Sequence, residues 1–173
     1  HISLSEILSV FFGKGAEGIN SEILLNFRLP KAITAVLAGA SLSVAGLMMQ
    51  TLFRNPLADP YILGVSSGAS LGVALVMMAA AFLPVAFVSS GWALIAAAII
   101  GASIVLVLVV GVSFKVNNAV SLLIVGIMFG TIASSFVSVL QNFSNPDAIK
   151  LFVMWTFGSL SAVTWNYMTV LLP

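Results

Sequence analysis

Residues 60–114 decide the fold class of this chain. They read PYILGVSSGASLGVALVMMAAAFLPVAFVSSGWALIAAAIIGASIVLVLVVGVSF and contain no Asp, Glu, Lys, Arg or His. At roughly 20 residues for one crossing, this stretch is long enough to cross a bilayer twice. In the whole chain 61% of the residues are hydrophobic and 6% are charged, whereas soluble domains have about 25% charged residues. We therefore predict a membrane protein.

The same apolar runs determine the kind of secondary structure. Backbone N–H and C=O groups in hydrocarbon need partners inside the protein, which only helices and closed barrels provide. The runs lack the period-two alternation of a barrel strand. The predicted fold class is therefore all-α, a polytopic helical membrane protein. Residues 32–141 are predicted to form four transmembrane helices, at about Ala32–Phe53, Tyr61–Leu83, Trp92–Phe114 and Ala119–Gln141.

Two flanking regions are more polar. Residues 1–31 are predicted to form surface helices and a connection, because Ser3-Leu4-Ser5-Glu6 matches a capping box and Pro30 is expected to end a second short helix. An irregular loop before Pro30 is the alternative to that second helix. Residues 142–173 begin with a polar connection, Asn142–Lys150. For 151–173 two alternatives remain open, a fifth span or a surface helix leading into a further span. Because His1 is not a start methionine, we expect that the chain begins inside a longer protein.

Glycines recur at four-residue spacing in the predicted spans. Small residues at this spacing let transmembrane helices approach closely. Two overlapping GxxxG units, formed by Gly64, Gly68 and Gly72, start the second span, and another lies in the fourth. Gly39 belongs to a similar series of small residues in the first span. Each series is expected to lie on one helical face. Packing within the chain is the commonest meaning of such motifs, and a subunit interface or a pathway lining is the alternative. The residues predicted to pack helices are Gly39, Gly64, Gly68 and Gly72.

The sequence offers little for catalysis. Gly64-Val65-Ser66-Ser67-Gly68 fits the GxSxG nucleophile elbow, but the elbow needs a preceding strand and a histidine base, and the only histidine is His1. No Asp, Glu or His lies inside the four spans, which disfavours a proton relay. Cysteine is absent and no GxxxxGK[ST] motif occurs. We expect no catalytic residue, no metal site and no cofactor, and the net charge of +1 gives no reason to expect nucleic acid as a partner.

One longer pattern is more specific. Arg28-Leu29-Pro30-Lys31 is followed by Ala38-Gly39-Ala40, Gly46 and Gln50, then by Asn55-Pro56-Leu57-Ala58-Asp59-Pro60 and Leu63-Gly64-Val65-Ser66-Ser67-Gly68-Ala69. This pattern resembles the FecCD-type (BtuC-like) permeases, which carry iron-siderophore, haem or cobalamin. Trp155, Gly158 and Trp165 are similar to a mid-chain segment of the same family.

The resemblance implies a type II ABC importer permease with ten membrane helices in the bacterial cytoplasmic (inner) membrane. Such a permease forms a homodimer or pairs with a paralogous permease. It binds two cytoplasmic ATPase subunits and is loaded by an extracytoplasmic substrate-binding protein. By this resemblance the chain would cover the second to about the sixth helix. The first helix and the C-terminal half would be missing.

The resemblance also implies roles for particular residues. Arg28 and Lys31 would dock the binding protein at the outer face, although they could instead anchor the helix end by snorkelling. The residues expected to line the pathway are Gly126, Gly130, Ser134 and Ser138. Those expected at the inner gate are Asn117, Asn118, Ala119 and Val120. The rival functions are a secondary transporter or channel not driven by ATP, and an intramembrane hydrolase using Ser66.

Overall fold

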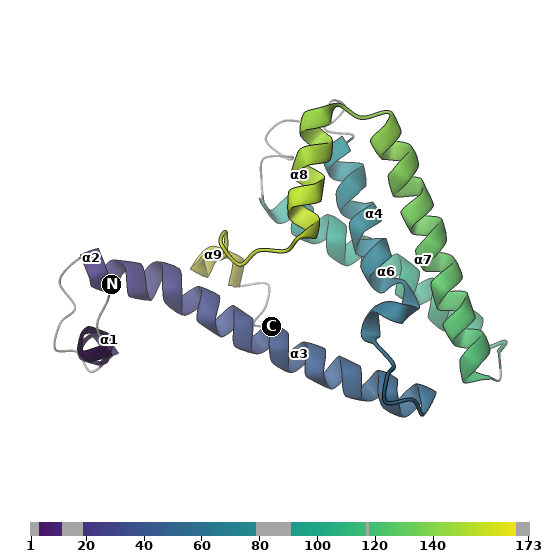
Figure 1. Ribbon diagram of the computed structural model, residues 1–173, viewed down its shortest axis with the longest axis horizontal. Coiled ribbons are helices and arrows are strands. Elements are labelled where there is room, and N and C mark those ends of the chain that lie inside the picture. The colour runs from purple at the N-terminus through teal and green to yellow at the C-terminus, as the bar shows by residue number, and fades with distance from the viewer. Residues whose placement is uncertain (1–3, 12–18, 79–90, 117, 169–173) are drawn as a thin grey trace. The chain divides into compact units, whose positions relative to one another are not determined.

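The computed structural model describes residues 4–11, 19–78, 91–116 and 118–168, and these contain helices but no β-strand (Figure 1). The all-α prediction is thus confirmed. The α-helices are α1 Leu4–Phe11, α2 Ile19–Glu22, α3 Leu29–Phe53, α4 Val65–Met78, α6 Gly91–Ser113, α7 Ala119–Asn142, α8 Pro146–Thr156 and α9 Trp165–Met168. A π-helix, η1, covers Ile23–Arg28, and a 3₁₀ helix, η2, covers Pro60–Leu63.

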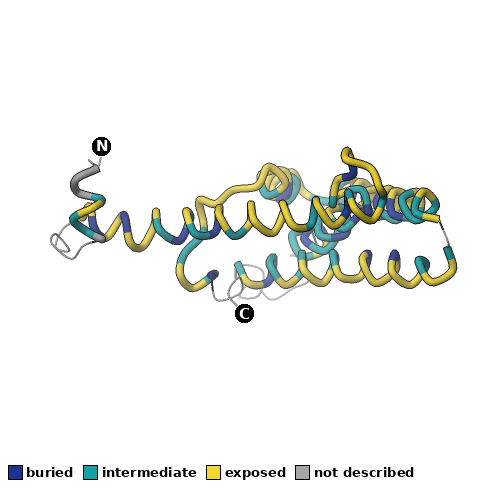
Figure 2. The backbone as a smooth tube through the Cα atoms, turned by 90° about the horizontal axis from the view of Figure 1, so that it is seen from below, coloured by how far each residue is buried: buried dark blue, intermediate teal, exposed yellow. Residues whose placement is uncertain are grey.

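Three helical stretches are long and apolar enough to cross a membrane, judged by length and composition: Ile19–Phe53, Gly91–Ser113 and Ala119–Asn142. Between 11% and 28% of their most apolar windows is buried inside the chain, and Figure 2 shows how few positions along the backbone are buried. A soluble fold would bury these faces, so the chain is a polytopic helical membrane protein. α4 is apolar but shorter, and residues 79–83 of the second predicted span lie outside the described part.

Several predicted helix ends agree with the structure because side chains mark them. α7 begins at Ala119, where the Asn118 side chain caps the helix, and α6 is shifted by one residue from its predicted bounds. α3 ends at Phe53. Arg54 then adopts a left-handed φ of 47°, and the Asn55 side chain accepts a hydrogen bond from the Leu57 N–H at 2.9 Å. That local bond is an Asx turn, which closes the break.

The predicted helix break at Pro30 is wrong. The chain is helical from Ile19 through Phe53, with Pro30 inside. The reason lies in η1, where the Leu29 N–H bonds to the Leu24 carbonyl five residues back. This wider turn is a π-bulge, which changes the hydrogen-bond register just before the proline and so accommodates the missing N–H. The predicted division at residue 31 therefore falls inside one helix, and whether it separates surface from membrane stays a prediction.

The two ends of the chain differ in part from expectation. α1 is present, although Ser3, where its predicted capping box begins, lies outside the described residues. The predicted connection at Asn142–Lys150 is wrong in its second half, because α8 starts at Pro146 under a cap from Asn145, whose side chain accepts from the Ala148 N–H at 2.8 Å. One unbroken helix over 151–173 is excluded, since α8 ends at Thr156. A further span after α9 stays a prediction.

Two compact units are present, residues 1–42 with 159–173, and residues 43–158. In the second unit, α4 packs against α6, α7 and α8 (Figure 1). Val73 and Ala74 of α4 are completely buried, and they form a cluster with Val137 of α7 and Phe152 of α8. α4 is thus the central helix of this unit, and its neighbours set the candidate site.

Candidate functional site at the glycine junction and the helix ends

The candidate site begins where the chain turns from η2 into α4. The Asp59 carboxylate accepts a hydrogen bond from the Tyr61 N–H at 2.7 Å and so caps η2. η2 ends at Gly64, which has φ 74°. A side chain at this left-handed position would strain the backbone, so glycine is needed for the turn itself. The second predicted span therefore does not start as one helix at Tyr61.

Gly64 also lies directly against α7. A Cβ atom on Gly64 would stand 2.8 Å from the Gly126 carbonyl oxygen and 2.8 Å from the Gly130 nitrogen. From the other side, a Cβ atom on Gly126 would stand 2.8 Å from the Leu63 Cα. The contact is backbone against backbone, and no side chain can move aside to relieve it. We call these three residues, Gly64, Gly126 and Gly130, the glycine junction.

A second close approach joins α4 to α6. A Cβ atom on Gly68 would stand 3.0 Å from the Val105 Cβ, and one on Gly72 would meet the Ala97 carbonyl. Gly64 was predicted to share a helix face with Gly68 and Gly72, and this is wrong: it precedes α4 and faces α7, whereas the other two face α6. The fourth predicted packing residue, Gly39, is exposed, and a Cβ atom there would meet nothing within 4 Å.

Gly101 is a packing residue that the sequence analysis missed. A Cβ atom on Gly101 would meet the Gly68 carbonyl oxygen and stand 3.1 Å from the Gly72 nitrogen. The sequence did contain a signal for it, because Ala97 and Gly101 are small residues four apart, the spacing that lets transmembrane helices approach closely. This spacing identifies a helix face that could pack closely, but it does not identify the helix that packs against it.

The four residues predicted to line a pathway do not share one surface in the described chain. Gly126 and Gly130 are buried in the glycine junction, whereas Ser134 and Ser138 are exposed. The Ser134 hydroxyl donates to the Ser67 hydroxyl at 3.4 Å, and the Ser138 hydroxyl donates to the Ser134 carbonyl at 3.1 Å. The pathway assignment stays a prediction. Of the four residues, only Ser134 and Ser138 are exposed and so available to line a pathway.

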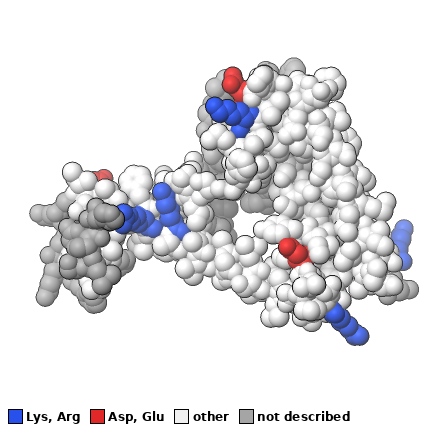
Figure 3. All heavy atoms as spheres, in the orientation of Figure 1, with Lys and Arg blue, Asp and Glu red and all other residues white. Residues whose placement is uncertain are grey.

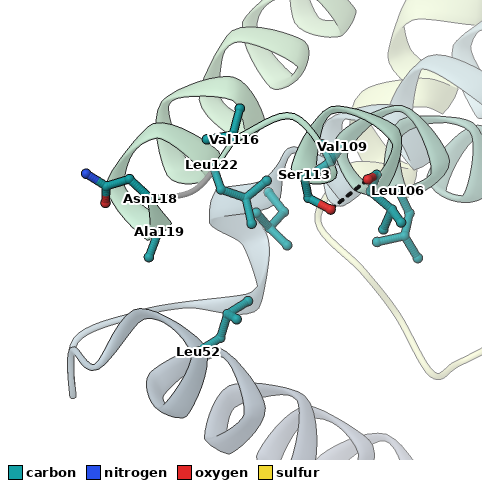
Figure 4. A pocket seen from close by; sticks show the side chains of 10 residues that line it. Leu52, Leu106, Val109, Ser113, Val116, Asn118, Ala119 and Leu122 are labelled. Carbon is teal, nitrogen blue, oxygen red and sulfur yellow. Dashed lines mark hydrogen bonds between the residues drawn. The ribbon is translucent and has the colours of Figure 1, made fainter.

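A cavity of about 390 Å³ lies where the end of α6 meets the start of α7 (Figure 4). Leu52 at the end of α3 and Leu122 of α7 point into this space. The lining is apolar apart from Ser113 and Asn118, and it also includes Leu63, Leu106, Val109, Val110, Val116 and Ala119. We call this space the helix-end pocket.

Both polar residues of the helix-end pocket already have backbone partners. The Ser113 hydroxyl donates to the Val110 carbonyl at 2.6 Å, and the Asn118 Oδ1 accepts from the Val120 N–H at 3.0 Å. Of the predicted gate residues, Asn118 and Ala119 line the pocket, Val120 is exposed and Asn117 lies outside the described residues. The gate assignment stays a prediction. The pocket presents an almost purely apolar wall.

Replacing Asn118 tests how the start of α7 is held. Asn118→Ala removes the cap and should cost about 1 kcal/mol, which lowers the thermal midpoint by about 2–4 °C if the protein behaves like a domain of 150–250 residues. Asn118→Asp keeps an acceptor oxygen and should unfold at the wild-type midpoint. The measurement is thermal unfolding of the detergent-solubilised protein. Equal midpoints for Asn118→Ala and wild type would contradict the capping role.

The predicted docking pair, Arg28 and Lys31, lies where η1 meets α3. Arg28 is the last residue of η1 and is exposed, and Lys31 follows three residues later, partly buried. Residues three apart on a helix are neighbours, and Figure 3 shows basic side chains side by side on this part of the surface. Two positive charges therefore lie close together at this point of the helix.

Two kinds of chemical site, a metal site and a serine nucleophile, can be compared with the described part of the chain. It contains no group of three or more His, Cys, Asp or Glu residues that could hold a metal ion. Ser66 is exposed on α4 and follows a 3₁₀ helix. The nucleophile elbow requires a strand at that point, so the GxSxG match lacks its structural context.

Comparison with known proteins finds one family and relatives that are all named as transport permeases. The model of the FecCD transport family matches residues 1–173. A "Probable iron chelatin transport system permease protein" of Helicobacter pylori is 40% identical over 147 residues, covering 84% of this chain and 42% of that protein. The "Vitamin B12 import system permease protein BtuC" of Vibrio parahaemolyticus is 33% identical over 174 residues, covering 99% of this chain and 50% of that protein.

A solved structure has a similar fold. It is described as "An inward-facing conformation of a putative metal-chelate type ABC transporter", and it superposes with a TM-score of 0.76 at 30% sequence identity. The match covers 87% of this chain and 46% of that chain. The chain thus spans about half the length of the curated relatives it matches.

Proposed function

The chain belongs to the FecCD transport family, and from this membership we propose that it is part of the permease subunit of an ATP-driven importer for a chelated metal compound. Ferric siderophore, haem and cobalamin are the candidate cargoes. The family match over the whole chain carries the proposal. The names of the relatives, which include an iron chelatin and a vitamin B12 system, support this class of cargo.

The proposed partners follow from membership of the FecCD transport family. α4, α6 and α7 contain no Asp, Glu, Lys, Arg or His, so these three helices offer no ionisable group on which an ion gradient could act. ATP binding and hydrolysis are assigned to cytoplasmic ATPase subunits, and the permease itself is proposed not to be an enzyme. A binding protein outside a bacterial inner membrane would deliver the cargo, and a second permease copy or a paralogue would complete the pathway.

The packing favours one place for the gating movement. The glycine junction holds η2 and α7 backbone to backbone, so these elements are proposed to move as one body. The helix-end pocket is a cavity of about 390 Å³ beside the end of α6 and the start of α7, and we propose that these two helix ends separate there at lower cost. Packed regions switch between discrete arrangements rather than deforming continuously. Asn118 and Ala119 would then move with α7 as gate residues.

ATP-dependent uptake tests the proposal against its rival. The complete permease is reconstituted in vesicles with its ATPase and binding protein, and uptake of radiolabelled iron chelate, haem or cobalamin is measured. We expect uptake that needs ATP and is lost when the Walker-A lysine of the ATPase is replaced. Uptake that persists without the ATPase and follows an ion gradient would establish a secondary transporter instead.

A further inference from the structure

The π-helix η1 leaves one backbone carbonyl without its helical donor. A π-helix pairs an N–H with the carbonyl five residues back, as the Leu29 N–H pairs with the Leu24 carbonyl at the end of η1. The next donor in this register would be residue 30, facing the carbonyl of Leu25. Residue 30 is Pro30, which has no N–H. The Leu25 carbonyl therefore needs a donor from outside the helix ladder.

The structure supplies that donor from a distant part of the chain. The indole Nε1–H of Trp165 donates to the Leu25 carbonyl oxygen at 2.9 Å, across 140 positions of sequence. Both residues belong to the same compact unit. Indole is a donor only, so it matches a lone carbonyl without leaving a lone pair of its own unpaired.

The neighbouring residues are packed rather than loosely placed. Leu24 and Pro30, on either side of the carbonyl in sequence, are buried, Pro30 almost completely. Met168, one helical turn beyond Trp165 in α9, is 1% exposed. Trp165 itself is 42% exposed, so its ring is partly buried in addition to being hydrogen-bonded.

We propose that Trp165 replaces the backbone donor that Pro30 removes, and that this bond straps α9 to the π-turn. The strap holds the turn that ends in Arg28. The pairing is specific to the combination of a proline at position 30 and a tryptophan at position 165. The proposal rests on hydrogen-bond register and does not depend on the transport function.

Restoring the missing N–H makes the proposal testable. Pro30→Ala gives position 30 a backbone N–H, which can bond to a carbonyl within the helix and leave Trp165 dispensable. Trp165→Phe keeps an aromatic ring but removes the donor. Both variants and the double variant are made in the complete permease in lipid nanodiscs. Amide hydrogen exchange is followed in peptides covering 19–31.

The expected result is a dependence of one substitution on the other. Trp165→Phe alone should speed exchange of the Arg28 and Leu29 amides about fivefold, the effect of losing one hydrogen bond of ordinary strength. In the Pro30→Ala background the same substitution should change exchange less than twofold. The matched control is Trp92→Phe in α6, which also removes an indole N–H and should leave these peptides unchanged.

Two results would overturn the proposal. One is unchanged exchange in Trp165→Phe with proline present, which would mean that the indole bond holds nothing. The other is the same acceleration with and without proline, which would mean that Trp165 acts by packing alone. If the variant protein unfolds altogether, Pro30→Ala should restore folded protein in the double variant, and failure to do so also counts against the strap.

Discussion

Gly101→Ala should prevent α4 and α6 from packing, whereas Gly111→Ala in the same helix should leave the protein folded. A Cβ atom on Gly101 would overlap the Gly68 carbonyl oxygen and stand 3.0 Å from the Gly68 carbonyl carbon. Backbone atoms of a helix cannot rotate away, so the two helices must separate. A Cβ atom on Gly111 would meet nothing within 4 Å. The two variants therefore carry the same Gly→Ala substitution, one at a helix contact and the other away from any contact.

The size of the effect follows from two opposing contributions. Alanine favours a helix over glycine by about 1 kcal/mol in both variants. Overpacking typically costs about 1–3 kcal/mol, and backbone overlap places Gly101→Ala at or above the upper end. We expect Gly101→Ala to give little monodisperse protein by size-exclusion chromatography. Gly111→Ala should match wild type or unfold at a slightly higher temperature. Equal midpoints for the two variants would contradict the close approach of α4 and α6.

The fold could be predicted where side chains mark helix ends, and not where tertiary packing overrides local rules. Asn118 stands directly before the predicted span Ala119–Gln141, Asn is a residue type that favours helix starts, and α7 begins after it. Pro30 was interpreted as a stop because proline usually breaks a helix. The π-turn that accommodates it, and the donor that Trp165 provides, depend on contacts across the chain. No short sequence pattern predicts the π-turn or the hydrogen bond from Trp165.

Asn145-Pro146 illustrates a different ambiguity. The same dipeptide is typical of a turn and of a helix start, because Asn is a good N-cap and Pro fits the first helical position. The structure uses it as the start of α8. Phe152 of α8 is buried against α4 in the cluster that surrounds Val73. Burial of Phe152 favours the helix start over the turn. The dipeptide Asn145-Pro146 by itself does not reveal that burial.

The candidate site was only half visible in the sequence. Four-residue spacing identified small residues at Gly64, Gly68 and Gly126, but it could not say which helix each one faces. Gly64 turned out to need its glycine for a left-handed φ as well as for contact with α7. The helix-end pocket depends on three separate helix ends meeting in space, which no motif encodes.

Reversing both charges of the docking pair should weaken association with the binding protein about 100-fold. This expectation rests on the proposed function, in which Arg28 and Lys31 meet acidic residues of that partner. Like charges brought together at an interface cost several kcal/mol, and about 2.7 kcal/mol corresponds to 100-fold in affinity. The double variant Arg28→Glu with Lys31→Glu is measured by surface plasmon resonance of the complete permease in nanodiscs.

The control separates docking from a general loss of positive charge. Lys115→Glu makes the same kind of charge reversal, at one site instead of two, at an exposed lysine just beyond α6. By the resemblance to FecCD-type permeases, we propose that Lys115 lies on the opposite side of the membrane from the docking pair. The affinity of the Lys115→Glu variant for the binding protein should equal that of wild type. The wild-type interaction should also weaken as salt is raised, because exposed charges are screened within about 8 Å at physiological ionic strength. If the double variant binds like wild type at low salt, the basic pair only anchors the helix end at the lipid headgroups, where snorkelling side chains need no protein partner.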